Sequence, residues 1–195
     1  LDPASAEIVA ITEGASTPSD RLAAALTEHI GLTFPVRTAR AAPTSLVLAV
    51  EPQPHSSSPQ AFSITFPDAD TVRLGGATEL ALEFAVDELL RRFAGIDWLF
   101  PGELGVSVDD PSLAAIIIPR VAITEAPGFT YRSISGSYSS QTLVSPVPQW
   151  LKRMRLTDSP ALDRDPDCFA PRSTCPLLAT PSSSISSLVL MPSWL

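Results

Sequence analysis

The feature that most constrains this chain is a helical run that leads directly into a Trp-Phe-Pro-Gly corner, over residues 77–105. Apolar residues recur at helical spacing, and charged residues lie off this stripe. Thr78 is suited to cap the helix, and Gly95 to end it. One apolar helix face cannot form a core alone. The run therefore predicts a helix packed on a sheet, with the corner as a docking element, and it indicates no chemistry. The predicted stripe is Leu82, Val86, Leu89 and Phe93.

The rest of the pattern predicts an α/β fold, a mixed β-sheet with two helices. Another helix is expected from Thr17 as N-cap and Pro18 as first residue to a stop at Gly31, with Leu22 and Leu26 on its apolar face. Two of the extended segments, separated by an Asp-Ala-Asp turn, form a predicted hairpin. The expected extended segments are residues 7–12, 34–39, 45–50, 61–66, 71–74, 106–110 and 114–118.

The chain divides into three parts by pattern. Residues 1–126 form the α/β domain, and residues 127–157 begin a new unit with a short strand and a helix opening near Pro148. Residues 158–195 are rich in Pro and Ser and show neither helix nor strand periodicity. We therefore expect this last part to be an irregular, non-native tail.

Composition excludes several classes of partner. The net charge of −8 argues against a nucleic-acid surface, and no apolar run is long enough to span a membrane. Leu1 follows neither an initiator Met nor a leader, so we expect either a removed leader or a start inside a gene. Cys168 and Cys175 favour two free thiols over a disulfide, and no metal site or cofactor is predicted.

Three pieces in order carry a resemblance: GIDWLFPGELG (residues 95–105), APGFTYR (126–132) and WLKRMR (150–155). Over about residues 8–155 the chain resembles the N-terminal portion of a bacterial family of glycoside-hydrolase-like proteins. There a small α/β domain, similar to those of alpha-glucuronidases and beta-N-acetylhexosaminidases, precedes a (β/α)8 barrel. The resemblance implies that FTYR is the first barrel strand and WLKRMR the first barrel helix. It also implies an exported protein, periplasmic or extracellular, whose barrel binds carbohydrate.

Two residues are candidate substrate contacts. By the resemblance, Arg132 holds hydroxyls of a terminal sugar, although the chain continues SISGSYSS where hexosaminidases have an Asp and an Arg. A structural salt bridge is the alternative role for Arg132. Trp98 is a candidate for stacking on a sugar ring, while its apolar neighbours favour packing between domains.

No catalytic residue is predicted. Glu103 with Asp109 and Asp110 could be offered as an acid pair, but turn and loop roles are favoured. His29 and His55 have no partners at metal-ligand spacing. Gly75-Gly76 lacks the spacing of a phosphate loop, and no G-x-S-x-G elbow exists.

The resulting hypothesis is a non-catalytic N-terminal accessory region of a carbohydrate-active protein, inactive alone. The alternative is a freestanding carbohydrate- or protein-binding module, and an unrelated small α/β domain is a third interpretation. By the resemblance, relatives should continue with a stretch like His-Pro-Glu-Phe-Phe. One permissible set of codons for the tail of this chain encodes that stretch when the reading frame is shifted by two bases. We therefore expect a frameshift between Leu156 and Thr180, with the barrel lost or read separately.

Overall fold

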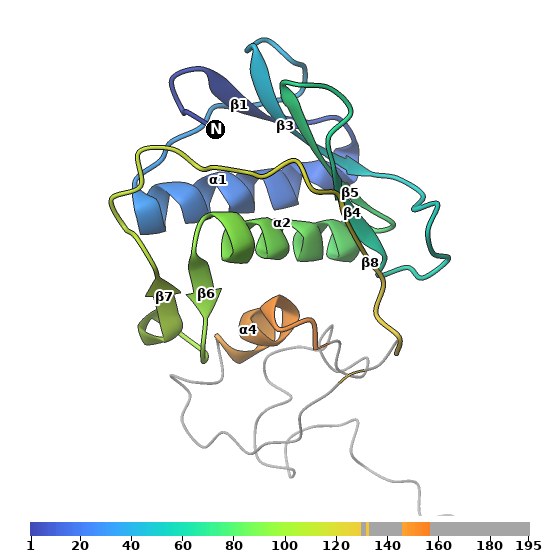
Figure 1. Cartoon of the computed structure of the whole chain (residues 1–195). Coiled ribbons are helices and arrows are strands. Elements are labelled where there is room, and N and C mark those ends of the chain that lie inside the picture. Colours follow the sequence, from blue (N-terminus) through green and yellow to red (C-terminus); the bar gives the residue numbers. More distant parts are fainter. Residues whose placement is uncertain (130–131, 133–145, 157–195) are drawn as a thin grey trace, which may run out of the picture. The chain divides into compact units, whose positions relative to one another are not determined.

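A six-stranded mixed sheet carries two helices on one face (Figure 1). The computed structural model describes residues 1–129, 132 and 146–156. The strand order is β2-β1-β3-β5-β4-β8; the first four strands in this order are parallel, and β4 is antiparallel to both of its neighbours. The mixed α/β fold expected from the sequence is confirmed. The strands are β1 (Ala6–Ala10), β2 (Val36–Arg37), β3 (Thr44–Val50), β4 (Phe62–Thr65), β5 (Thr71–Gly76) and β8 (Ile123–Glu125).

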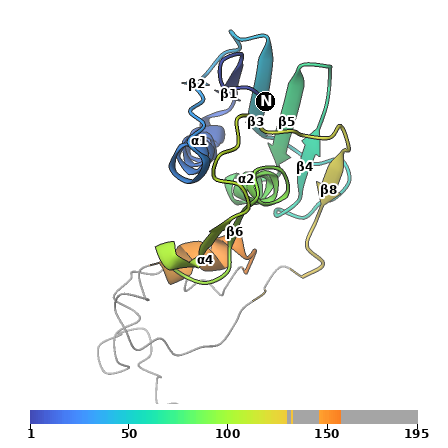
Figure 2. The ribbon, with the colours of Figure 1, turned by 60° about the vertical axis from the view of Figure 1, so that its left-hand side comes forward.

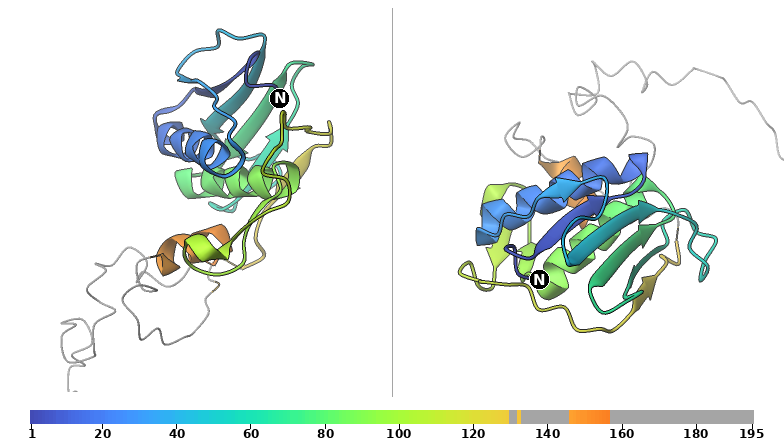
Figure 3. Two further views of the ribbon diagram at one scale, coloured as in Figure 1. Left: turned by 90° about the vertical axis from the view of Figure 1, so that its left-hand side faces the viewer. Right: turned by 90° about the horizontal axis from the view of Figure 1, so that it is seen from above.

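Both long helices cover the same side of this sheet, as Figures 2 and 3 show. Helix α1 (Ser16–Ile30) follows the 3-10 turn η1 (Glu13–Ala15), and α2 (Glu79–Phe93) follows β5. Alternate side chains of the strands meet the apolar faces of the helices in one core, because successive strand residues point to opposite faces. Its fully buried members include Ile8, Leu22, Leu26, Leu46, Leu48, Phe62, Ile64, Leu74, Leu82 and Leu89.

Helix α2 begins and ends where the sequence predicts. The Thr78 hydroxyl oxygen accepts the Ala81 N–H at 3.2 Å, and Gly95 follows the helix with a φ of 64°. The corner then forms β6 (Ile96–Trp98) and the 3-10 turn η2 (Glu103–Gly105), and β7 (Val106–Val108) pairs antiparallel with β6. The helix predicted near Pro148 is also present, as α4 (Val147–Arg153).

Two local expectations were wrong. Thr17 is not the cap of α1, because η1 runs directly into the helix, which starts at Ser16 with Ala15 as N-cap. Residues 114–118 form no strand; Ile116 is buried, and its N–H donates to the Leu1 carbonyl at 3.0 Å. No strand was predicted at Ile123–Glu125, where the structure has the edge strand β8; three residues are too few to show strand alternation.

Several expectations fall on residues that the structure does not describe. These are the strand at Thr130 and Tyr131, the tail with Cys168 and Cys175, and the proposed frameshift between residues 156 and 180. They stay predictions. Within the described part, no helix is long and apolar enough to cross a membrane.

The close contact between Gly76 and the start of α2 supplies a test of this fold. A β-carbon at Gly76 would lie 2.2 Å from the Leu82 backbone nitrogen, so the backbone would have to shift. We expect Gly76→Ala to lower the free energy of unfolding by about 3 kcal/mol, as overpacking does. Gly128→Ala is the matched control, since a β-carbon there meets nothing within 4 Å. Urea denaturation of both variants measures the difference, and equal stabilities would contradict the packing described.

Candidate functional site

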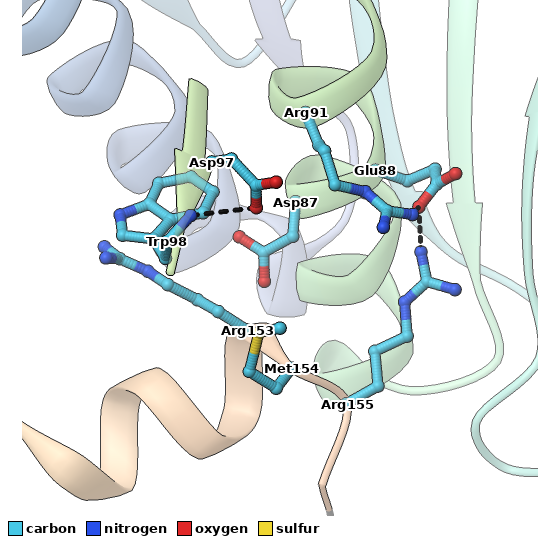
Figure 4. Close-up of a pocket in the computed structure, with 8 residues that line it drawn as sticks. All are labelled: Asp87, Glu88, Arg91, Asp97, Trp98, Arg153, Met154 and Arg155. Carbon is cyan, nitrogen blue, oxygen red and sulfur yellow. Dashed lines mark hydrogen bonds and ion pairs between the residues drawn. The ribbon is translucent and has the colours of Figure 1, made fainter. Parts of the chain in front are cut away.

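A small cavity of about 120 Å³ lies where α2, β6 and the segment from α4 to Arg155 meet. We call this place the α2–α4 junction (Figure 4). It is rich in opposite charges drawn from segments far apart in the sequence. The lining residues are Asp87, Glu88, Arg91, Asp97, Trp98, Arg153, Met154 and Arg155.

Glu88 is the centre of this charge cluster. Its side chain is fully buried, and it forms ion pairs with Arg91 at 2.6 Å, with Arg92 and with Arg155. Arg155 also pairs with Glu125 of β8, which Arg92 reaches at 3.2 Å. Arg91 and Arg92 belong to the same helix as Glu88, whereas Arg155 comes from the chain after α4. The network therefore ties α2 to β8 and to the end of α4.

The arginines keep Glu88 ionised. Burial alone would raise the pKa of Glu88, but hydrogen bonds from Arg91 and Arg92 and the charge of Arg155 outweigh it and lower the pKa below its ordinary value of 4.5. An ionised, fully buried carboxylate suits a structural role. A general acid needs the reverse shift and access to a substrate.

Asp87, the preceding residue, points to a different partner. It is 4% exposed and pairs with Arg21 of α1, which also bonds Glu83 at 3.0 Å. Burial raises the pKa of Asp87, against the lowering effect of Arg21. Its Oδ2 has no hydrogen-bond partner among the described residues. Asp87 thus links α1 to α2 and leaves one acceptor facing the junction.

Trp98 joins β6 to α4. The indole is 4% exposed, the Arg153 guanidinium lies 4.2 Å from the centroid of its ring, and Trp150 Nε1 donates to the Trp98 carbonyl at 3.0 Å. Trp98 is therefore a packed residue, with a cation–π contact to its ring and a hydrogen bond to its backbone. A sugar contact by Trp98 stays a prediction.

Arg132 lies beside the end of the same segment. Its Nε donates to the Arg155 carbonyl at 2.8 Å and its Nη1 to the Phe129 carbonyl, while its buried Nη2 has no partner in the described part of the chain. No carboxylate of the described residues pairs with it. Arg132 also lines a hollow next to Glu125 and Pro127. The sugar-binding role of Arg132 also stays a prediction.

The structure does not gather the remaining candidates into a site. Glu103, Asp109 and Asp110 are exposed, and hydrogen bonds from Ser112 lower the pKa of Asp110. A ring nitrogen of His55 lies 3.3 Å from the Glu125 carbonyl. No group of three His, Cys, Asp or Glu residues that could hold a metal occurs among the described residues.

Sequence reasoning missed the buried charges. It placed Asp87 and Glu88 off the apolar stripe with the other charged residues, yet both are buried. The available signal was that Glu88 is followed by arginines three and four residues later. That pattern also occurs on exposed helices, so it could not reveal Arg155 as a further partner.

The fold is found within glycoside hydrolases, although no family model matches this chain. One similar solved structure is a family 20 exo-beta-N-acetylglucosaminidase from Vibrio harveyi, with a TM-score of 0.51, 14% identity and coverage of 80% of this chain and 21% of that one. Another is a family 115 4-O-methyl-alpha-glucuronidase with specificity for decorated arabinogalactans. Its TM-score is 0.54 at 12% identity, and the match covers 80% of this chain and 25% of that one. A third is a family 138 enzyme targeting pectin rhamnogalacturonan II. Its TM-score is 0.50 at 11% identity, and the match covers 77% of this chain and 18% of that one. The chain thus corresponds to between 18% and 25% of the length of these enzymes, and at these identities the likeness shows the fold alone.

A curated sequence also matches in part. The deoxyuridine 5'-triphosphate nucleotidohydrolase of Enterobacter sp. (strain 638) is 33% identical over 79 residues. The match covers 38% of this chain, and the chain spans about half (52%) of the length of that protein. This coverage is too small to assign the chain to that family.

The Glu88 network predicts a large and pH-dependent effect of one substitution. Glu88→Gln leaves three arginines without their shared carboxylate, so we expect it to lower the free energy of unfolding by about 3 kcal/mol at pH 7. Glu79→Gln, on the exposed first turn of the same helix, is the control and should change it by less than about 0.5 kcal/mol.

The pH dependence identifies the cause. Because the folded-state pKa of Glu88 is lowered, its stabilisation is complete above the ordinary value of 4.5 and is lost as the pH falls through the folded-state pKa. The difference in the free energy of unfolding between wild type and Glu88→Gln should therefore become smaller at acidic pH. Urea denaturation at a series of pH values measures it, and a difference that stays constant would show that packing, not charge, is responsible.

Proposed function

We propose that this chain is the non-catalytic accessory region of a carbohydrate-active, glycoside-hydrolase-like protein, with residues 1–126 as the accessory domain and residues 127–157 as the start of its barrel. The observation that carries this proposal is the ion pair between fully buried Glu88 and Arg155. Glu88 lies in the long helix of the α/β domain, and Arg155 closes the stretch that the resemblance assigns to the first barrel helix. The pair thus anchors the second unit to the first.

Other contacts of α4 support the same role. Val147 and Leu151 are 2% and 6% exposed, so the helix buries an apolar face. The Trp150 indole bonds the Trp98 carbonyl, and Arg153 covers the Trp98 ring. Apolar burial, a hydrogen bond and a buried ion pair together fix α4 more firmly than a linker helix would need.

The chemistry of the junction carboxylates favours a supporting role over catalysis. Glycoside hydrolysis uses two carboxyl groups that flank the scissile bond and stay accessible to it. Glu88 and Asp87 are instead buried and engaged by arginines of three different segments. We infer that the acid and base of the parent protein belong to a part of the barrel other than the residues described.

Substrate contact is proposed for Arg132 and Trp98. The Nη2 of Arg132 has no partner among the described residues, which leaves a donor for a sugar hydroxyl. Trp98 would act mainly by holding α4 in place beside that donor. Carbohydrate as the partner and export as the location follow from the resemblance and accord with the glycoside-hydrolase fold.

A freestanding binding module is the second candidate. The corner after β6 exposes three large apolar side chains: Leu99 (63%), Phe100 (48%) and Leu104 (91%). A partner protein could cover them. Saturable binding of residues 8–126 alone to immobilised polysaccharides would favour this candidate, whereas self-association through exposed apolar surface would favour the accessory region.

Docking of α4 through Arg155 is testable by hydrogen exchange. We expect Arg155→Gln to speed exchange of the α4 amides about tenfold or more, which corresponds to a loss of about 1.4 kcal/mol. Amides of β3 should keep their rates. Lys152→Gln is the matched control, because Lys152 is exposed and lies 3.9 Å from its partner Glu83. Equal α4 rates in all three proteins would show that Arg155 does not anchor this helix.

The absence of catalysis is tested with chromogenic glycosides. We expect the full chain to release no 4-nitrophenol from the N-acetyl-beta-glucosaminide or the alpha-glucuronide, because its junction acids are neutralised by arginines. A buffer blank and a heat-treated sample are the controls. Release that scales with the concentration of the folded chain would overturn the accessory role.

A further inference from the structure

A second cavity, of about 270 Å³, shares a wall with the α2–α4 junction. Trp98 and Arg153 line both hollows and so stand between them. The far side of the second cavity is built by the C-terminal end of α1, the corner after β6 and the outer side of α4. Three segments distant in the sequence, residues 28–29, 98–106 and 146–153, therefore converge on this hollow.

The walls of this cavity combine three aromatic side chains with several polar ones. Trp98, Phe100 and Trp150 all contribute to the lining. Phe100 is 48% exposed, so part of its ring is available to a ligand. Aromatic rings offer flat apolar surface, and a few polar groups among them are typical of small-molecule sites.

One buried donor in this wall lacks a partner. Trp98 is 4% exposed, and its Nε1 has no hydrogen-bond partner among the described residues. Figure 4 shows this nitrogen pointing away from Asp87, and Trp98 also lines the second cavity. An unmade hydrogen bond at a buried N–H costs about 1–3 kcal/mol. A ligand atom that accepts this bond recovers that cost.

The remaining polar groups indicate an uncharged ligand. Glu28 and Gln149 are exposed members of the lining and supply acceptors and a donor amide. Arg153 supplies a further donor, and the His29 imidazole can donate or accept. Glu103 adds a second carboxylate, so the two acids outnumber the arginine and disfavour a phosphate or carboxylate ligand. A metal ion is disfavoured as well, since no described cluster of ligating residues could hold one.

We propose that this cavity binds a single uncharged sugar ring. A pyranose combines hydroxyls that donate and accept with apolar C–H faces, which matches donors, acceptors and aromatic rings in one hollow. The volume is just below the roughly 300–1,000 Å³ of sites for drug-sized molecules, as suits one ring. The choice of carbohydrate rests on the proposed function, but the site is separate from Arg132.

Saturation-transfer NMR on the full chain tests this site. The probes are D-glucose, D-galactose, D-xylose and N-acetyl-D-glucosamine, each titrated to about 100 mM, and we expect saturable binding of at least one with a Kd of about 1–10 mM. Phe100→Ala and Gln149→Ala should each weaken it about fivefold or more. Leu104→Ala is the control, because Leu104 is 91% exposed on the same corner and does not line the cavity.

Two results would overturn the proposal: no saturable binding of any of the four sugars, or binding that Phe100→Ala and Gln149→Ala leave unchanged. Circular dichroism shows whether the variants keep the fold. The two proposals also fail separately. An absence of sugar binding with α4 still anchored by Arg155 refutes the sugar site alone, whereas glycoside hydrolysis by a chain whose cavity binds sugar refutes the accessory role alone.

Discussion

The arrangement of the segment at residues 146–156 depends on the burial of one charge, the carboxylate of Glu88. An ionised group removed from water costs several kcal/mol unless cations and hydrogen bonds meet it. Arg91 and Arg92 belong to the same helix as Glu88, and Arg92 also reaches Glu125 of the edge strand β8. Arg155 must arrive from 67 residues away, and it can do so only when α4 lies against α2. The cost of burying Glu88 thus constrains where residues 146–156 lie.

The neighbouring acid extends this constraint to the other helix. Successive residues on an α-helix point about 100° apart, so Asp87 and Glu88 reach different surroundings. Asp87 turns to Arg21 of α1, while Glu88 turns to Arg155 and, through it, to Glu125 of β8. Two adjacent carboxylates of α2 therefore hold three other elements against this helix. Asp87 holds α1, and Glu88 holds α4 and the sheet edge.

The sequence predicted the parts of the molecule that local pattern specifies. The apolar spacing of α2, its Thr78 cap and the alternation in the hairpin of β4 and β5 depend on near neighbours, and the structure confirms them. The start of α1 was missed because a 3-10 turn replaced the expected Thr17 cap. The junction could not be predicted, since Glu88 with arginines three and four residues later reads as an ordinary exposed pair. Arg155, the partner of Glu88 from outside the helix, is brought near by tertiary contact. The spacing of residues within the helix carries no information about that contact.

Trp98 makes the two cavities interdependent. Its carbonyl accepts a bond from Trp150 of α4, its ring is covered by Arg153, and the same two side chains line the second cavity. Undocking α4 would remove Trp150 and Arg153 from that cavity and leave the Trp98 indole without its cover. A ligand there must then bind the docked state more tightly than the undocked one, and by linkage it stabilises docking by the same factor. If residues 127–157 begin a barrel, as we propose, a sugar bound in this cavity would reinforce the contact that holds α4 against the α/β domain.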